Sequence, residues 1–226
     1  MFTGDERLIN GPAGVEVTML DFWRWVYSNI SYSTQRGTFA DFIVKCALDY
    51  ASVPTKPEIG NGWEPYDLEG PEIYRDGMMV KSRIEVKAVG YYQEWDGETA
   101  REGRNPKFSI GKARVRDERG DIKKAAIQKW NNDLYVLCLF KGKKKSDSEL
   151  DLSLWDFFVV PTYYFSENPK TENQRSIVLT KVQKLFDPPC GFEGLGYKII
   201  SVCEEISDHN RMLENQSSSS SSSSSP

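Results

Sequence analysis

Three charged residues have the types and the spacing that a hydrolytic metal site requires. Glu85 and Lys87 stand one residue apart in a run where apolar side chains alternate with them. Because successive side chains of a strand point to opposite faces, these two would share one face, roughly 7 Å apart. Asp67 lies upstream, and the dipeptide Asp76-Gly77 between them is a strong signal for a tight turn. We therefore predict two antiparallel strands in which Asp67 reaches Glu85.

Two carboxylates with a lysine beside them suit Mg²⁺ and a water nucleophile. Mg²⁺ binds oxygen ligands and keeps several waters, so Asp67 and Glu85 would suffice as protein side chains, with the Val86 carbonyl as a further ligand. The remaining positions accept a phosphate oxygen and the attacking water. Lys87 would orient that water or stabilise developing negative charge. The alternative is an exposed strand face with an ordinary Glu and Lys, and an Asp67 that caps a turn.

Longer segments around this trio resemble the PD-(D/E)XK nuclease superfamily, and within it a group of small bacterial proteins. The similar segments occur in the same order at residues 36–44, 63–68, 84–95, 133–139 and 155–162. The resemblance implies a restriction-endonuclease-like α/β fold, in which helices flank a central mixed β-sheet. It also implies a DNA endonuclease that depends on Mg²⁺ or Mn²⁺, in bacterial restriction, defence or mobile-element biology.

The same resemblance adds two residues to the site. Asp41 occupies a helix position where relatives often carry an acidic residue, usually Glu, that faces the metal; it would contact the metal directly or through water, and the alternative is a solvated helix charge. Gln93 resembles a glutamine that follows the catalytic strand and assists at the scissile phosphate. Some relatives pair that glutamine with a tyrosine, and this chain has Gly97 there instead. For Arg36 we expect a structural role.

A basic segment at residues 97–124 directly follows the catalytic strand, where a phosphate backbone would have to lie. Trp95, just before it, could stack on a base, although packing in the core is the alternative that we favour. The alternative for the basic residues is a solvated loop and helix. The cations predicted to bind nucleic acid are Arg101, Arg104, Lys107, Lys112 and Arg114.

The surrounding pattern predicts the elements that position these residues. Helical spacing occurs at residues 17–32, with Thr18 and Asp21 near the first turn, and again from Arg36 to Tyr50. Strands are expected at residues 63–68, 78–92 and 157–160. The almost uninterrupted apolar run at 133–140 indicates a strand covered on both faces. Short helices are expected at 180–186 and 194–206.

Composition describes an ordinary globular protein of 226 residues with a net charge of −4. We expect a flexible lead-in at residues 1–17, a single nuclease-like domain at 18–207 and a disordered serine-rich tail at 208–226. No apolar run is long enough for a membrane helix and no signal peptide is present, so we expect a cytoplasmic protein. The four cysteines are scattered, which favours free thiols over a disulfide framework or a zinc site.

The acidic balance, with a pI near 5.3, does not favour nucleic-acid binding, although local patches rather than totals attract phosphates. Three other functions stay open: a catalytically silent nucleic-acid-binding module of the same fold, a nuclease for RNA or for a particular nucleic-acid structure, and a protein-interaction domain. DNA is the expected partner. The resemblance also suggests a homodimer, and a modification or helicase partner is conceivable but unidentified.

Overall fold

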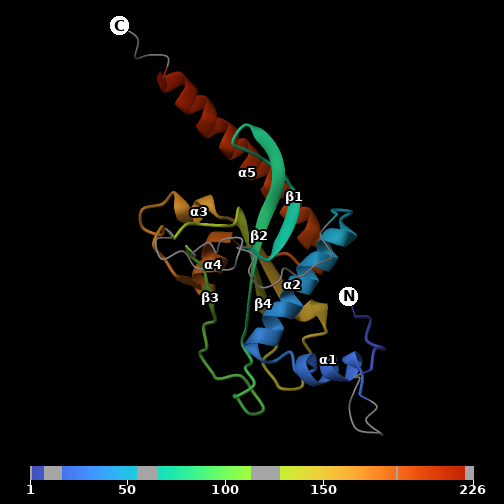
Figure 1. The fold of residues 1–226 in the computed structure, drawn as a ribbon. Helices are drawn as coiled ribbons and strands as arrows, with labels where there is room; N and C mark the ends of the chain where they lie inside the picture. Colours follow the sequence, from blue (N-terminus) through green and yellow to red (C-terminus); the bar gives the residue numbers. More distant parts are fainter. Residues whose placement is uncertain (1, 8–16, 55–65, 113–127, 187, 222–226) are drawn as a thin grey trace.

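A computed structural model describes residues 2–7, 17–54, 66–112, 128–186 and 188–221. The elements in chain order are α1 (Met19–Tyr27), α2 (Ser33–Tyr50), β1 (Leu68–Arg75), β2 (Met78–Gly90), β3 (Lys107–Ser109), β4 (Leu134–Phe140), a 3₁₀ helix (Leu152–Leu154), β5 (Trp155–Pro161), α3 (Tyr163–Ser166), β6 (Ser176–Val178), α4 (Leu179–Phe186) and α5 (Phe192–Ser221). The protein has the expected α/β fold, with a central mixed sheet flanked by helices (Figure 1).

The central sheet has the strand order β1-β2-β4-β5. Strands β1 and β2 form an antiparallel hairpin, β2 and β4 are parallel, and β4 and β5 are antiparallel. The hairpin turns at Asp76 and Gly77, whose φ angles of 53° and 80° lie in the left-handed region that a tight primed turn requires. Strand β1 starts at Leu68, so the strand expected from residue 63 begins later, and residues 63–65 lie outside the described ranges.

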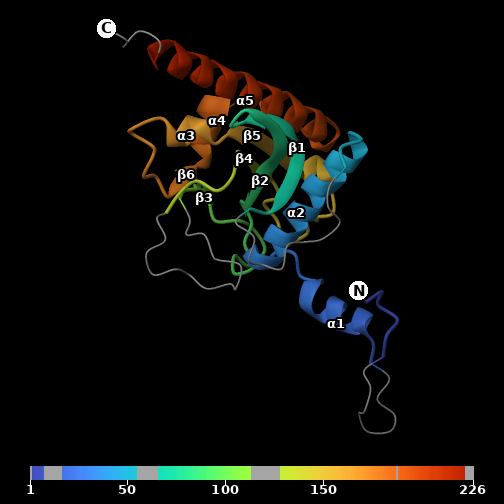
Figure 2. The same ribbon diagram turned by 45° about the horizontal axis from the view of Figure 1, so that its top comes forward.

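Strand β4 is buried along its whole length, as its apolar run predicted. Its alternate side chains enter two separate apolar clusters, one on each face of the sheet. Helices α2 and α5 cover one face, where Ile84 and Val86 of β2 are also buried. The small β3–β6 sheet, α3 and α4 cover the other face (Figure 2). Glu85 and Lys87, opposite Tyr135 and Leu137 in the register, point to this second face.

Close packing inside the hairpin depends on Gly70. A Cβ at this position would lie 2.6 Å from Ile84 Cδ1 and 2.7 Å from Ser82 Oγ, closer than side-chain atoms approach. The β1–β2 register is irregular between Glu69 and Glu72, where Gly70 and Pro71 stand. This bulge precedes the rest of the ladder and leaves the pairing of Leu68 with Ile84 intact.

Asp133 ties the hairpin to β4. Its carboxylate accepts hydrogen bonds from Arg75 Nη1 at 2.7 Å, from Arg83 Nη2 at 2.8 Å and from the Arg83 backbone N–H at 2.7 Å. Burial alone would raise the pKa of Asp133, but the hydrogen bonds and charge of Arg83, together with Arg75, hold it below its ordinary value. We name Asp133, Arg75 and Arg83 the arginine clamp.

The two ends of the chain differ from the pattern that the sequence predicts. Helix α5 is longer than the segment expected at 194–206, because it continues to Ser221 and so includes residues 208–221, where the sequence predicts a disordered tail. Glu214 explains the extension, because it accepts hydrogen bonds from Tyr74 Oη and Gly77 N at the hairpin. Serine costs a helix well under about 1 kcal/mol per residue relative to alanine, so an anchored helix can continue through it. Helix α5 and the hairpin project together from the body (Figure 1).

The N-terminal end is also attached, although a flexible lead-in was expected. The carbonyls of Gly4 and Glu6 accept hydrogen bonds from Leu20 N and Met19 N, so residues 2–7 fold back on the start of α1. Thr18 and Asp21 form a reciprocal capping box, in agreement with the sequence. Residues 8–16 lie outside the described ranges. Helix α1 buries none of its residues and stands away from the sheet (Figure 2).

Two general expectations can be compared with the described residues. All four cysteines are free thiols, as predicted. None of the helices within the described ranges combines the length and the apolar character that crossing a membrane requires.

Candidate active site

The candidate site lies where β1 begins and β2 continues without it. Asp67 N donates to the Ile84 carbonyl at 2.9 Å, which is the last backbone bond between the two segments. The Asp67 carboxylate then accepts the N–H of Val86 at 2.7 Å. Because the N–H and C=O of one strand residue point to the same side, the Val86 carbonyl lies on this edge too. The hairpin therefore places Asp67, Glu85 and Val86 as the sequence predicted.

Lys87 lies between the two carboxylates. Its ammonium contacts Glu85 Oε1 in a short ion pair and stands 3.8 Å from Asp67 Oδ2. The three side chains are between one fifth and one third exposed, which makes them accessible without being fully solvated. Burial lowers the pKa of Lys87, but the charges of Glu85 and Asp67 outweigh this and raise it, so the amine stays protonated at neutral pH. As an ammonium it can donate to a water or to a phosphoryl oxygen.

Asp41 approaches this cluster from α2, on the other face of the sheet. Burial, the charge of Asp67 and, to a lesser degree, the charge of Glu85 raise its pKa to about 7, although Lys87 opposes the shift. The pKa of Glu85 is also raised, first by burial and then by Asp67, again against the influence of Lys87. The cluster therefore holds more acidic groups than its single cation can neutralise.

This donor set fits a divalent cation in its chemistry. Three carboxyl groups and one backbone carbonyl offer the hard oxygen ligands that Mg²⁺ or Mn²⁺ prefers. Burial is the main cause of the raised pKa values of Asp41 and Glu85, and the charge of Asp67 adds to it; a bound cation would favour the ionised form of both groups. No group of three or more acidic, histidine or cysteine side chains in the described part of the chain is already arranged around one metal position. The fit therefore rests on the Asp67 and Glu85 carboxylates that share Lys87, and Asp41 interacts with them through its charge from the other face of the sheet.

Glu85 and Lys87 open into a pocket of about 360 Å³. Ser109 and Gly111 form part of its wall, and Lys112 and Arg175 bring two cations to it. In such a pocket the cations can bind the phosphate oxygens of a phosphodiester, and the carboxylates can bind a metal cation beside it. Lys112 was predicted to bind nucleic acid. Arg175, more than sixty residues later in the sequence, was not, because only the pairing of β6 with β3 brings it here.

A second pocket of about 410 Å³ lies further along β2 and β3. Gln93 lines this pocket rather than the first one, so it is not brought together with Glu85 and Lys87. Its side-chain amide donates to the Gly90 carbonyl at 2.7 Å and its oxygen faces Arg36 Nη1 at 3.5 Å. A direct part for Gln93 at the reacting phosphate therefore has no support from this geometry.

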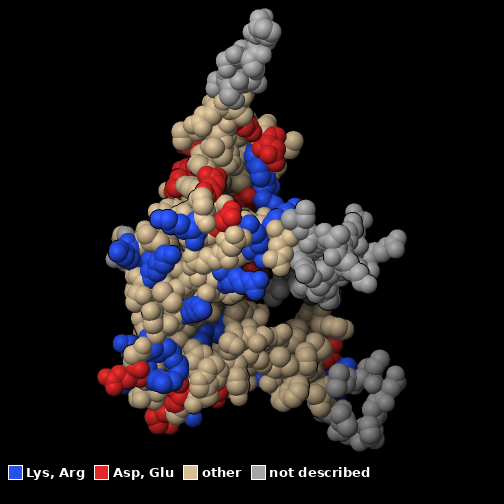
Figure 3. Space-filling model, turned by 90° about the vertical axis from the view of Figure 1, so that its left-hand side faces the viewer, with Lys and Arg blue, Asp and Glu red and all other residues tan. Residues whose placement is uncertain are grey.

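The four remaining cations that were predicted to bind nucleic acid have different surroundings. Arg104 is held at 2.5 Å by each oxygen of Asp96 and donates to the Tyr91 carbonyl, so its guanidinium fixes a loop and is not free for phosphate. Lys107 lines the second pocket, and Arg101 is exposed. Arg114 lies outside the described ranges. Figure 3 shows Lys and Arg spread over the middle of the face that carries α3 and β3.

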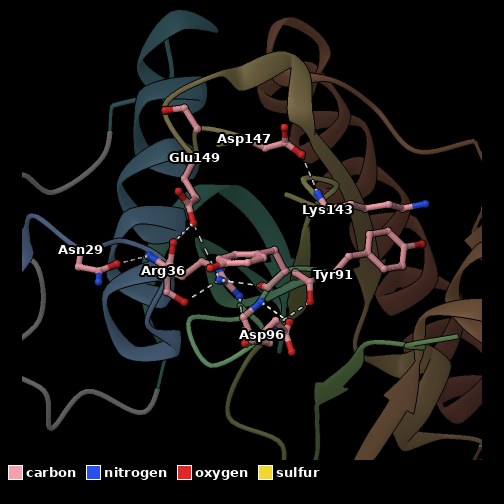
Figure 4. A network of polar contacts seen from close by, with 12 residues as sticks. Asn29, Arg36, Tyr91, Asp96, Lys143, Asp147 and Glu149 are labelled. Atoms are coloured by element: carbon pink, nitrogen blue, oxygen red, sulfur yellow. Dashed lines mark hydrogen bonds and ion pairs between the residues drawn. The ribbon is translucent and has the colours of Figure 1, made fainter. Parts of the chain in front are cut away.

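Arg36 has the structural role that the sequence suggested. It is 1% exposed, and its Nη2 donates to the carbonyls of Ser31 at 2.7 Å and Tyr92 at 3.2 Å (Figure 4). Trp95 differs from expectation, because it is 71% exposed and does not pack in the core. Tyr92 fills that role instead, with an exposure of 2%.

Comparison with known proteins assigns no family. No family model matches the chain, and no curated protein matches its sequence. Among solved structures, a bacterial homing endonuclease, I-Ssp6803I, is similar with a TM-score of 0.37 and 16% sequence identity, over 70% of this chain and 84% of that one.

Proposed function

We propose that this protein is an endonuclease that hydrolyses DNA phosphodiester bonds and depends on Mg²⁺ or Mn²⁺. The observation that carries the proposal is the meeting of Asp67, Glu85 and Lys87 beside a pocket that also holds Lys112 and Arg175. An exposed strand face with incidental charges would not explain why two carboxylates share one ammonium next to further cations. The resemblance to PD-(D/E)XK nucleases supports the same reaction and a setting in restriction, defence or mobile-element biology.

Each of these residues would have a separate role in the reaction. Asp67, Glu85 and the Val86 carbonyl would hold the cation, and Asp41 would support it from α2. The cation would supply Lewis acidity towards the phosphoryl oxygen and the attacking water. Lys87, as an ammonium, would donate to the water or to a non-bridging oxygen as negative charge develops. Lys112 and Arg175 would bind the neighbouring phosphates of the strand.

A plasmid-nicking assay tests this assignment. The wild-type protein is expected to nick supercoiled DNA with Mg²⁺ and to be inactive in EDTA. Lys87→Ala is expected to lose activity by about 100-fold or more. Lys81→Ala is the matched control, because Lys81 lies on the same strand, is well exposed and only faces Glu72 at 3.8 Å. Equal activity of Lys87→Ala and the wild type would contradict the proposal.

Other outcomes distinguish the competing functions. Salt-sensitive DNA binding without cleavage under any metal would favour the silent binding module. Cleavage of RNA but not of DNA would change the substrate and keep the site. If the protein neither bound nor cleaved nucleic acid, this result would favour a protein-interaction domain.

A further inference from the structure

The second pocket has features of a binding site that the hydrolytic chemistry does not use. It is lined by Ser33 and Arg36 of α2, by Gly90 at the end of β2, and by Gln93, Trp95 and Lys107. Strand β2 connects it to the candidate active site, since Lys87 lines the first pocket and Val89, on the same face of the strand, lines the second. Strand β3 does the same, with Ser109 in the first and Lys107 in the second. A strand of nucleic acid that occupies the first pocket would therefore continue into the second.

The α2 end of this pocket is suited to an anion. Helix α2 has 18 residues, begins at Ser33, and has neither a side-chain cap nor an acidic residue in its first turn. The positive end of its dipole is therefore not offset by its own sequence. Lys107 adds a charge that has no carboxylate partner within the described ranges.

Arg36 provides a second, independent indication. Its side chain is almost fully buried in the pocket wall, and its Nε has no hydrogen-bond partner among the described residues. The nearest carboxylate that it pairs with, Glu149, is 4.0 Å away and also accepts from Ser31 Oγ (Figure 4). The other guanidinium nitrogens hydrogen-bond to neutral oxygens of Ser31, Tyr92 and Gln93, so no carboxylate closer than Glu149 neutralises this charge at the pocket.

Trp95 offers a flat apolar surface beside these cations. Its loop is anchored on both sides, because Gln93 N donates to Asp96 Oδ2 at 2.8 Å and Tyr92 Oη donates to the Gly97 carbonyl at 3.0 Å. Asp96 is in turn held by Arg104. The protein thus fixes the loop firmly while the indole stays 71% exposed. A positioned, uncovered indole next to a cation is the arrangement that stacks on a nucleobase.

We infer that the second pocket binds an unpaired nucleotide of the substrate strand, with its base stacked on Trp95 and its phosphate at Lys107 and the N-terminus of α2. This inference rests on the proposed function, whose substrate it narrows to DNA with a locally unpaired stretch. Stacking on Trp95 needs an uncovered base face, which a base inside a duplex does not offer. The span from Lys87 to Gly90 is roughly 10 Å. Gly90 and Trp95 line the same pocket, so the stacked base lies a short way along the strand from the cleaved bond.

Binding in EDTA tests the site separately from catalysis. The probes are a fluorescein-labelled 20-nucleotide single strand and the blunt 20-base-pair duplex of the same sequence, measured by anisotropy with the full chain. Trp95→Ala is expected to weaken single-strand binding by about 5- to 100-fold and to change duplex binding by less than about twofold. Trp25→Ala is the matched control, because Trp25 is 82% exposed on α1, away from the pocket. It is expected to bind as the wild type does.

Salt dependence tests the phosphate contact. Lys107→Ala is expected to weaken single-strand binding and to reduce the slope of log affinity against log salt by about 0.7, the contribution of one phosphate. Lys81→Ala is expected to leave the slope unchanged. No measurable single-strand binding by the wild type would overturn the inference. Equal single-strand affinity of Trp95→Ala and Trp25→Ala would also overturn it. So would a Trp95→Ala variant that loses as much affinity for the duplex as for the single strand.

Cleavage separates failure of this inference from failure of the proposed function. With Mg²⁺, a duplex that contains a three-nucleotide bubble is expected to be cut faster than a fully paired one, and Trp95→Ala is expected to remove that preference. Loss of single-strand binding in Trp95→Ala without any cleavage by the wild type would support the pocket and refute the enzyme. Wild-type cleavage that ignores both the bubble and Trp95 would support the enzyme and refute the pocket.

Discussion

The arginine clamp and the candidate active site are two charged clusters on the same hairpin with opposite electrostatics. In the clamp, two arginines surround one carboxylate, and the pKa of Asp133 is held below its ordinary value. At the candidate site, one lysine serves several carboxyl groups, and the pKa of Asp41 is raised to about 7. The first cluster is satisfied by the chain alone. The second holds more carboxyl groups than cations, and raised pKa values of this kind are typical of a functional site.

The largest expected effect is on activity at the candidate site. Glu85→Gln is expected to reduce DNA cleavage by about 100-fold or more, because it removes a charged ligand. Its unfolding free energy in EDTA should stay equal or rise, since one of the crowded negative charges is gone. Glu72→Gln, an exposed carboxyl on β1, is the control for both measurements. If Glu85→Gln cleaved DNA at the wild-type rate, the candidate site would not differ from the arginine clamp in its functional role.

The opposite result is expected at the clamp. Asp133→Asn should cost about 3 kcal/mol of unfolding free energy, because it leaves two half-buried arginines without their carboxylate. The loss should be present above pH ~4 and should vanish as the pH falls through the lowered pKa of Asp133, where the wild type also loses its charge. Urea unfolding from pH 3 to pH 7 measures it. Asp208→Asn, an exposed pair partner on α5, should show no comparable loss.

Asp41 should show the reverse pH dependence. Its carboxyl binds a proton more tightly in the folded protein, with a pKa of about 7, than in the unfolded chain, where the pKa is about 3.9. Its contribution to stability is therefore full below pH ~4 and is lost as the pH rises through 7. Asp41→Asn should gain about 1–3 kcal/mol relative to the wild type between pH 5 and pH 8 in EDTA. If the unfolding free energies of the wild type and Asp41→Asn changed equally with pH over this range, the raised pKa of Asp41 would be contradicted.

The smallest expected effect is stabilisation by metal. At ten times its dissociation constant, Mg²⁺ should add about 1.4 kcal/mol to the stability of the wild type. For a chain of this length, that corresponds to a rise in Tm of about 3–6 °C. Asp67→Asn should lose most of this rise, whereas Glu72→Gln should keep it. Thermal unfolding with and without Mg²⁺ makes the comparison, and an unchanged wild-type Tm would count against the metal site.

Features set by local pattern could be predicted from the sequence. The alternation around Glu85 and Lys87, the Asp76-Gly77 turn and the pairing that brings Asp67 to Glu85 all depend on neighbouring residues and are confirmed. The burial of β4 on both faces follows from its apolar composition in the same way. The roles of the metal and of the catalytic residues stay predictions.

Features set by distant contacts could not be predicted. Asp133 meets Arg75 across more than fifty residues, and Arg175 reaches the first pocket only through the β3–β6 pairing. The charge of Arg104 predicts a phosphate ligand, but Asp96 binds its guanidinium. The length of α5 depended on Glu214 meeting the hairpin, which no property of the serine run indicates. In each case the deciding partner lies outside the local pattern.

The two-residue turn at Asp76 and Gly77 has a consequence for how insertions and deletions would affect the protein. A strand alternates its faces every residue, so a slip of the hairpin by one position would turn Glu85 and Lys87 towards the apolar cluster under α2 and α5 and turn Ile84 and Val86 towards the first pocket. Lengthening or shortening the turn would therefore disturb the packing on both faces of the central sheet. The length of the Asp76-Gly77 turn, at the far end of the hairpin, therefore determines the face on which Glu85 and Lys87 lie.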